Sequence, residues 1–177
     1  MSRTALERSQ IYRAFAAAFR SPEGGSDLFG PDVLPATPSD AATLFVDTFD
    51  PALSKEAVSL FGRSWLKREQ ADLFEELVRW YSFFDLKRAG GAELPDHIAV
   101  ELDFMQFLAW REHIHDGMAE AVATLRRAEH DFLSRHLSPM AQGLSEALAG
   151  RSDRYAVLPR LLAQFIADEL ATTGSPS

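Results

Sequence analysis

Apolar residues recur along this chain at intervals of three and four, and this spacing constrains the fold more than any other feature. The first clear case covers residues 4–19, where five apolar side chains fall on one side of a helix: Leu6, Ile11, Phe15, Ala18 and Phe19. Thr4 and Glu7 stand at the spacing of a capping box, which satisfies two backbone amides at a helix start. Strand-type alternation does not extend over any useful length, so the sequence predicts an all-α protein.

Turn-forming residues divide the rest of the chain into further helices. Gly90 and Gly91 are expected to end one helix, and Gly117 to break another. Ser138-Pro139 should open the next, because proline is favoured in the first turn, and Pro159 should start or kink the last. The resulting helices are predicted over residues 40–49, 55–61, 64–87, 96–113, 118–136, 138–150 and 154–171.

Two segments are expected to lie outside the helices. Residues 21–39 contain four prolines and three glycines, which predicts a partly mobile surface loop. Residues 172–177 form a polar tail. Because the sequence has no internal repeat and no second compositional regime, we expect residues 1–177 to form a single compact multi-helix domain.

Composition excludes several kinds of protein. The chain of 177 residues has no cysteine, which excludes disulfides, thiolate zinc sites and cysteine nucleophiles. The N-terminal residues lack an apolar run of the signal-peptide type, and no apolar run approaches the roughly 18 residues of a membrane span. We therefore expect a cytoplasmic protein without stable membrane insertion. The net charge of −8 argues against a nucleic-acid partner.

The negative charge is concentrated in residues 90–120. This stretch has one basic residue, Arg111, against seven acidic ones: Glu93, Asp96, Glu101, Asp103, Glu112, Asp116 and Glu120. A solvated helix face would explain the pattern. A docking site for a cationic partner would explain it equally well, because an acidic patch attracts positive charge.

The same region carries the most specific motif of the chain. A Trp80-Tyr81 pair is followed by a segment in which seven positions stand out: Pro95, Asp96, His97, Glu101, Leu102, Phe104 and Met105. This arrangement resembles the TorD/DmsD/NarJ family of redox-enzyme maturation chaperones, whose mark is a proline, an Asp-His pair, a Glu-Leu four residues later and then Phe-Met. The segments 11–19 and 132–137 also look like family elements. The family often has glycine where Asp85 stands, and tryptophan where Met140 stands.

The resemblance implies a compact α-helical fold of the TorD type, with no catalysis and no cofactor of its own. It also implies a client, the apo form of a molybdenum-cofactor oxidoreductase of the dimethyl-sulfoxide-reductase type. Family members bind the twin-arginine leader or N-terminal peptide of the catalytic subunit, and they hold back export or assembly until the cofactor is inserted. The chain itself would be a monomer or a helix-swapped dimer, with the 21–39 loop as a candidate hinge.

A receptor for such a leader needs carboxylates beside an apolar groove, because the leader begins with arginines and continues with apolar residues. The predicted client-peptide site therefore consists of Asp96, His97, Pro95, Glu101, Trp80, Tyr81, Phe84, Leu102 and Met105. Structural interpretations remain open beside this one. Asp96 could be a helix N-cap, and His97 and Glu101 could form a local pair. The aromatic residues, with Leu102 and Met105, could belong to the core.

Two other functions stand as alternatives to a chaperone. A di-metal helical-bundle enzyme needs two Glu-x-x-His pairs, and the chain has only Glu112 and His115 at that spacing. A helical transcription regulator needs a basic recognition helix, for which Arg126-Arg127 is the only doublet in a clear helix interior. Hydrolase elbows and glycine-rich phosphate loops do not occur. We therefore predict no metal site.

Overall fold

The computed structural model describes residues 3–24, 38–87, 93–151 and 153–173. In these ranges the only pairing of strand type is one isolated antiparallel bridge between Phe61 and His97. The all-α prediction is therefore confirmed. The helices are α1 (Ala5–Arg20), α3 (Pro38–Phe49), α4 (Gln70–Phe83), α5 (Ile98–Ile114), α6 (Ala119–Phe132), α7 (Ser138–Ala147) and α8 (Arg154–Thr173), with the short η1 (Gly62–Ser64) and the π-helical turn η2 (Leu133–Leu137).

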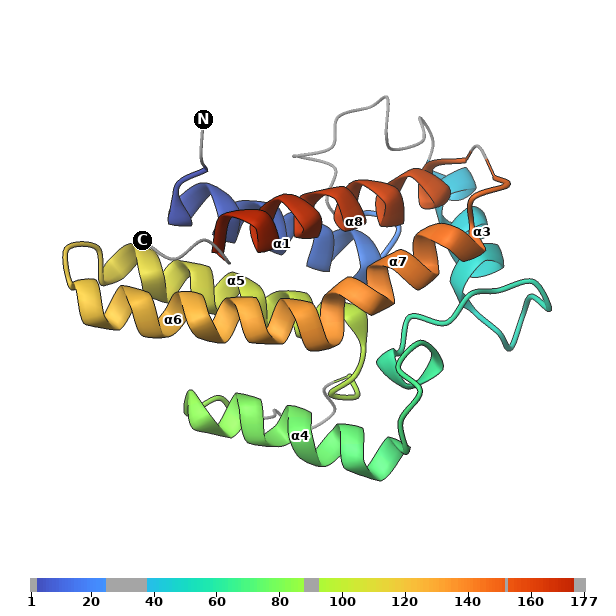
Figure 1. Cartoon of the computed structure of the whole chain (residues 1–177). Coiled ribbons are helices and arrows are strands. Elements are labelled where there is room, and N and C mark those ends of the chain that lie inside the picture. Colours follow the sequence, from blue (N-terminus) through green and yellow to red (C-terminus); the bar gives the residue numbers. More distant parts are fainter. Residues whose placement is uncertain (1–2, 25–37, 88–92, 152, 174–177) are drawn as a thin grey trace.

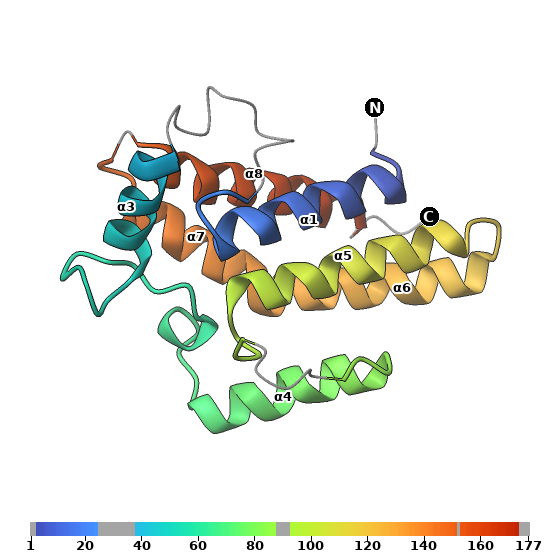
Figure 2. The ribbon, with the colours of Figure 1, turned by 180° about the vertical axis from the view of Figure 1, so that it is seen from behind.

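The helices form layers. Helices α1 and α8 lie along one side of the α5–α6 pair, and α4 lies along the opposite side (Figures 1 and 2). Helix α7 continues from α6 through η2 and packs against α8, while α3 lies at the same end of the molecule. The α5–α6 pair is thus covered on both sides, which explains why α5 is apolar around most of its circumference.

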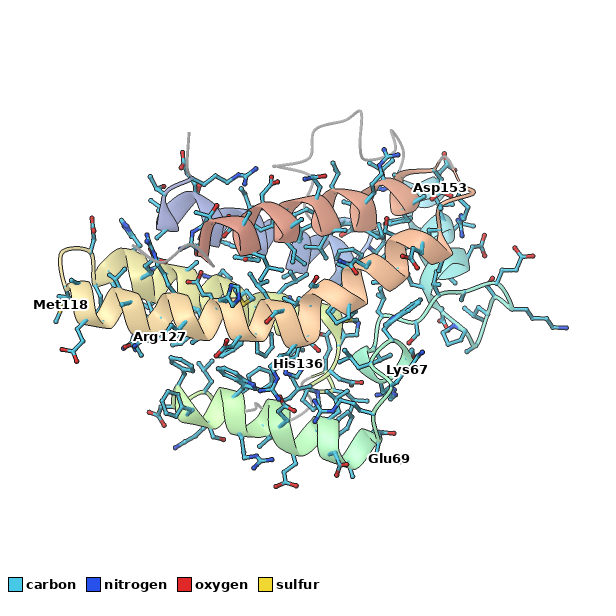
Figure 3. The ribbon with its side chains drawn as sticks, in the orientation of Figure 1. Lys67, Glu69, Met118, Arg127, His136 and Asp153 are labelled. Carbon is cyan, nitrogen blue, oxygen red and sulfur yellow. The ribbon has the colours of Figure 1, made fainter. Side chains whose placement is uncertain are left out.

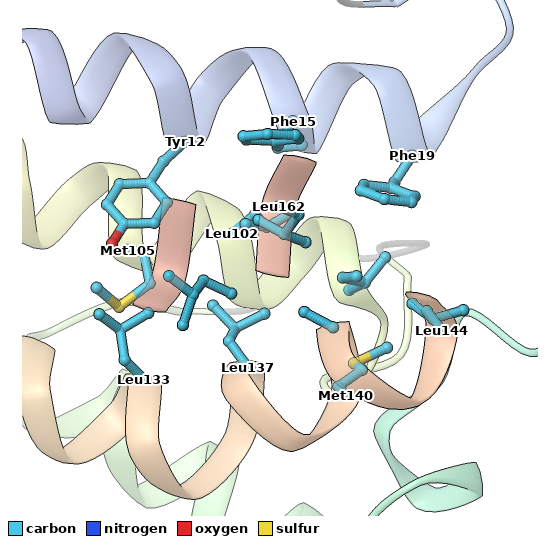
Figure 4. Packing of buried hydrophobic residues seen from close by; sticks show 14 of the residues in the cluster. Tyr12, Phe15, Phe19, Leu102, Met105, Leu133, Leu137, Met140, Leu144 and Leu162 are labelled. Carbon is cyan, nitrogen blue, oxygen red and sulfur yellow. The ribbon is translucent and has the colours of Figure 1, made fainter. Parts of the chain in front are cut away.

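The main core lies between α1, α5, α8 and the η2–α7 segment (Figure 4). Burial of these side chains away from water is the principal stabilising contribution to such a fold. Met140, which stands where the family often has tryptophan, belongs to this core. The side chains that meet here are almost fully buried: Tyr12, Phe15 and Phe19 from α1, Leu102 and Met105 from α5, Leu133 and Leu137 from η2, Met140 and Leu144 from α7, and Leu162 from α8.

Local signals set several helix ends as expected. The Thr4 hydroxyl accepts the backbone N–H of Glu7 at 3.2 Å, and the Glu7 carboxylate accepts the backbone N–H of Thr4 at 2.7 Å, so the capping box is confirmed. Gly117 has a φ of 88° and separates α5 from α6. Pro139 stands in the first turn of α7, and Pro159 lies inside α8.

The segment before α4 contains the main errors of the sequence prediction. Residues 55–61 were expected to be helical, but they are irregular and end in extended backbone. The end of this segment bonds to a distant one instead, since Ile98 donates its N–H to the carbonyl of Leu60 at 2.9 Å. Helix α4 covers only Gln70–Phe83 of the predicted 64–87. Before it, Trp65 follows the short η1 and donates its indole N–H to the Ser59 carbonyl at 2.9 Å.

Three predicted features lie wholly or partly outside the described residues. The 21–39 loop is described only at its ends, in residues 21–24 and in the first turn of α3. The helix stop at Gly90 and Gly91 lies outside the described ranges altogether. In the predicted polar tail, α8 continues to Thr173, and residues 174–177 are not described.

Helix α4 ends at a position that favours glycine. Asp85 has a φ of 58°, in the left-handed region, and it occupies the place where the family often has glycine. A left-handed backbone costs an L-residue about 1–2 kcal/mol, although aspartate tolerates it better than most. Glycine avoids this strain but loses more backbone entropy on folding.

Asp85→Gly is therefore expected to raise the free energy of unfolding by about 0.5 kcal/mol. Ser82→Gly is the matched control, because Ser82 lies in the helical last turn of α4 and glycine there should lower stability by about 0.5–1 kcal/mol. Urea denaturation of both variants measures the difference. Destabilisation of both variants alike would contradict the role assigned to the Asp85 backbone.

Candidate functional site

The predicted motif forms a turn that is clamped to the segment before α4. Gly62 donates its N–H to the carbonyl of Asp96 at 2.7 Å, and Ile98 donates to the carbonyl of Leu60. The ring of His97 packs edge-on against Phe61, with 5.1 Å between centroids. Two segments more than thirty residues apart in sequence therefore hold the start of α5 together.

Asp96 is the centre of this clamp. Its carboxylate is fully buried and accepts hydrogen bonds from the backbone N–H of Arg63 at 3.1 Å and from Arg63 Nη1 at 3.0 Å. The prediction that Asp96 caps α5 is wrong by one residue. His97 is the N-cap, and its Nδ1 accepts the N–H of Ala99 at 3.2 Å. Asp96 does not cap because Arg63 already occupies its carboxylate.

Glu101 lies behind Asp96 and is also fully buried. Among the residues that the structure describes, neither of its carboxylate oxygens has a hydrogen-bond partner. Burial, and then the nearby charge of Asp96, raise the pKa of Glu101 well above its usual range. Burial therefore favours the uncharged form of the Glu101 carboxyl group.

Burial also lowers the pKa of His97. Its Nδ1 lies 4.0 Å from a carboxylate oxygen of Glu93. The acidic edge continues on the surface, where Arg20 of α1 pairs with Glu93 at 3.1 Å and with Asp103 at 2.7 Å. Two of the carboxylates in the acidic stretch are thus half-exposed and already paired with a cation of the same chain.

The three aromatic residues of the predicted site pack around Phe104 of α5. Ring centroids of Trp80, Tyr81 and Phe84 lie 6.3, 5.1 and 5.6 Å from that of Phe104. The Tyr81 hydroxyl donates to the carbonyl of Pro95 at 2.8 Å. These aromatic side chains are half-buried, so each packs against the core and still presents part of its surface to solvent.

The structure thus brings together Pro95, Asp96, His97, Glu101 and Tyr81. Leu102 and Met105 turn the other way, into the main core beneath α1, and are fully buried (Figure 4). The structural interpretation of these two residues is therefore correct. Their apolar surface is not available to a ligand in this conformation.

A second contact ties α4 to η2, which holds residues 133–137 of the predicted 132–137 element. The carboxylate of Glu76 pairs with Arg68 and, at 2.7 Å, with Arg135, and it lies 3.3 Å from Nε2 of the fully buried His136. Burial lowers the pKa of His136 to about 4, so this ring is neutral near pH 7. Both sequence motifs therefore converge on α4, one through Tyr81 and one through Glu76.

Sequence reasoning missed an open pocket at the far end of α4. It has a volume of about 600 Å³, and its lining is mainly apolar: Phe84 from the end of α4, Arg111 and His115 from the α5 end, and Met118, Ala121 and Leu125 beyond the turn. Met118 stands at the α5–α6 turn (Figure 3). The side chain of Met118 is 59% exposed and that of Phe83 is 77% exposed. An apolar residue beside Gly117, in a predicted break between helices, is the only signal in the sequence.

A buried charge cluster was also missed. Arg8 of α1 lies between three glutamates of three other helices, with hydrogen bonds to Glu112, to Glu129 and, at 3.1 Å, to Glu169. All four side chains are nearly or fully buried. Burial raises the pKa of Glu129 to about 7, although the Arg8 charge opposes this shift.

The cluster left a signal in the sequence. Arg8 precedes Tyr12, Phe15 and Phe19 at helical spacing, so it lies on the core face of α1, where a lone charge requires partners.

Two further findings concern metal binding and membrane spans. In the described ranges, no group of three or more histidine or carboxylate side chains is placed to hold a metal ion. Within the same ranges, every helix is too short or too polar to cross a membrane. The features that the structure does show are a helical scaffold and an open apolar pocket, a combination that suits the binding of a partner peptide.

Comparisons with known proteins show which family the chain belongs to. The model of the family described as nitrate reductase delta subunit matches residues 6–146. The chain therefore belongs to this family, the NarJ/TorD-like group, and the resemblance found in the motif is confirmed.

Named relatives point the same way. The selenate reductase assembly chaperone protein of Thauera selenatis is 32% identical over 116 residues, which are 63% of this chain and 59% of the relative. The chlorate reductase assembly chaperone protein of Ideonella dechloratans is 29% identical over 116 residues, with the same coverage. The perchlorate reductase assembly chaperone protein of Dechloromonas aromatica is 31% identical over 100 residues, 55% of this chain and 45% of the relative. The chain thus matches less than two thirds of each relative's length, and these relatives bear the names of assembly chaperones and not of enzymes.

Proposed function

We propose that this protein is an assembly chaperone for a molybdenum-cofactor oxidoreductase. It binds the apo form of the catalytic subunit and its N-terminal leader, and it delays export or assembly until the cofactor is in place. The family and the names of the relatives support the chaperone class. The observation that carries peptide binding is the exposed apolar surface around the pocket at the end of α4.

This surface suits the apolar part of a leader. Phe83 and Met118 expose most of their side chains beside a pocket that Phe84 lines. Grouped apolar side chains in water mark a binding surface more often than a free one. Phenylalanine and methionine also adapt to apolar partners of different shape, which a chaperone needs because its client is not yet in its final structure.

The acidic edge suits the cationic part of a leader. Glu93 and Asp103 are half-exposed at the start of α5, and the buried carboxyls of Asp96 and Glu101 lie behind them. Trp80, Tyr81 and Phe84 would contact the peptide directly. Asp96 and Glu101 would supply buried carboxyls behind this edge, and the remaining residues of the proposed site would act by shaping it: Pro95, His97, Leu102 and Met105.

Capture of the client tests the function directly. A tagged form of the chain is expected to retain one large molybdoenzyme subunit, still bearing its N-terminal leader, from cells grown under respiratory conditions that induce such enzymes. Mass spectrometry of the captured proteins identifies it. Capture of no such subunit, from cells shown to be making these enzymes, would contradict the proposal.

Met118→Ser is expected to weaken binding of a leader-like peptide about tenfold, because the pocket loses a large apolar contact worth roughly 1.5 kcal/mol. The probe is a synthetic fluorescein-labelled peptide with two arginines followed by an apolar run, and fluorescence anisotropy gives the affinity. Leu53→Ser is the matched control, since Leu53 is 72% exposed but lies in the segment after α3. Equal weakening in both variants, or none in Met118→Ser, would remove the pocket from the site.

A further inference from the structure

The buried carboxylate of Asp96 is paired with the partly exposed side chain of Arg63. Asp96 has no exposed surface, whereas the Arg63 side chain is 30% exposed and lies with its guanidinium carbon 4.3 Å from the Phe61 ring centre. Arg63 belongs to the short η1, between α3 and α4. The carboxylate that would attract a cationic peptide is therefore already paired with a cation of the same chain.

The contact between these two side chains uses little of what a guanidinium can donate. Arg63 Nη1 donates to both carboxylate oxygens, at 3.0 and 3.2 Å, and neither Nε nor Nη2 donates to Asp96. A fork in which two nitrogens face two oxygens is the stronger arrangement. An incoming arginine could therefore make a better contact with Asp96 than Arg63 does.

A second carboxyl faces the same point. A Cβ atom added to Gly62 would lie 3.2 Å from Glu101 Oε1 and 3.6 Å from Asp96 Cβ, so both acids flank the backbone of Gly62. Glu101 has no hydrogen-bond partner among the described side chains and backbone groups, and it is fully buried. A buried polar group without a partner costs free energy, which a ligand with several N–H donors would recover.

We propose that Asp96 and Glu101 form a guanidinium-binding site, which Arg63 occupies until an arginine of the client leader displaces it. This inference rests on the proposed function, because it assumes that a leader with arginines binds. Arg63 then acts as an internal competitor. It keeps the buried acids covered in the free chaperone, and it makes release of η1 from the start of α5 a step in client recognition.

The arrangement predicts selectivity as well as competition. Arginine can offer two parallel N–H groups to Asp96 and a further one to Glu101, whereas lysine offers a single ammonium point. A glutamine pair lacks the charge altogether. Peptides that differ only in these two residues therefore separate the guanidinium site from the apolar pocket.

The test uses three labelled peptides, with Arg-Arg, Lys-Lys or Gln-Gln before the same apolar run, against the full chain and three variants. Arg63→Gln is expected to bind the Arg-Arg peptide about tenfold more tightly and the Gln-Gln peptide unchanged. Asp96→Asn should bind the Arg-Arg peptide as weakly as the Gln-Gln peptide. In the double variant, Arg63→Gln should have no further effect, because the carboxylate that it uncovers is gone.

Each outcome decides between the two proposals. Failure of the unmodified chain to bind any of the peptides would refute leader binding itself. Equal binding of the Arg-Arg and Gln-Gln peptides, or an Arg63→Gln variant that tightens both alike or neither, would refute the guanidinium site and leave the apolar pocket standing.

Arg63→Gln leaves Asp96 without its cation and could unfold, so a second measurement uses the unmodified chain. With ¹⁵N-labelled arginine, the side-chain signal of Arg63 should move towards that of a free arginine when the Arg-Arg peptide is added, and should not move with the Gln-Gln peptide. An unmoved Arg63 signal in the saturated Arg-Arg complex would overturn the proposal.

Discussion

Arg8→Met is expected to lower the free energy of unfolding by about 3–5 kcal/mol, because it leaves three buried carboxyl groups without their shared cation. Arg8 hydrogen-bonds to Glu112, Glu129 and Glu169, each from a different helix. Arg126 also pairs with Glu112, and Arg3 lies 3.9 Å from Glu169, whereas Arg8 is the only cation that pairs with Glu129 among the described residues. Methionine keeps an unbranched apolar stem like that of arginine but lacks the guanidinium, so the loss is mainly electrostatic.

Urea denaturation followed by circular dichroism measures this loss. Arg13→Met is the matched control, because Arg13 lies on the exposed side of the same helix and its replacement should change stability by less than about 0.5 kcal/mol. A similar small effect for Arg8→Met would show that the glutamates do not need the guanidinium.

The buried Arg8 cluster also determines how the free energy of unfolding changes with pH. The pKa of Glu129 is raised from 4.5 to about 7 in the folded protein, so between these values the folded state binds more protons than the unfolded state. Its contribution to stability is present below about pH 4.5 and is lost as pH rises through 7. Without Arg8 the pKa of Glu129 rises further, so the destabilisation of Arg8→Met should be largest above pH 7 and should shrink towards pH 5. An equal loss of stability in Arg8→Met near pH 5 and above pH 7 would contradict the raised pKa of Glu129.

The first helix shows what periodicity alone can predict. The spacing of Phe15 and Phe19 and the Thr4 capping box gave α1 to within one residue, because both signals are local. The partners of Arg8 could not be predicted in the same way. They lie more than a hundred residues away in three helices whose relative positions depend on the packing of the whole core.

The candidate site shows the same limit. The motif placed Pro95, Asp96 and His97 at the start of a helix, as the structure has them. The capping role of Asp96 failed because Arg63, more than thirty residues earlier, takes its carboxylate. The predicted 55–61 helix failed in a similar way, since Leu60 and Phe61 at its end pair with Ile98 and His97. Local propensity cannot anticipate a competing partner that only the tertiary fold supplies.

Phe104→Ala is expected to lower the free energy of unfolding by about 3–5 kcal/mol, and the loss should fall mainly on α4. Phe104 is 2% exposed. Its ring contacts three rings of the α4 segment, and it also lies 4.7 Å, between centroids, from Phe132 of α6. Because α4 lies apart from α1 and α8, on the other side of the α5–α6 pair, it is held by this aromatic cluster, by the buried Leu73 and Leu77 and by the Glu76 contacts (Figure 1).

Hydrogen exchange locates the effect. In Phe104→Ala, amides of α4 should exchange faster than global unfolding allows, because α4 opens locally. Amides of α1 and α8 should still exchange only through global unfolding. Phe104→Leu is the control, because it keeps most of the apolar volume and should cost less than about 1.5 kcal/mol. The leader-like peptide should also bind Phe104→Ala more weakly, since Phe84 forms one wall of the pocket and moves with α4. Unchanged exchange in α4, together with a lower global stability, would show that α4 is held by other contacts and that the pocket does not depend on the aromatic cluster.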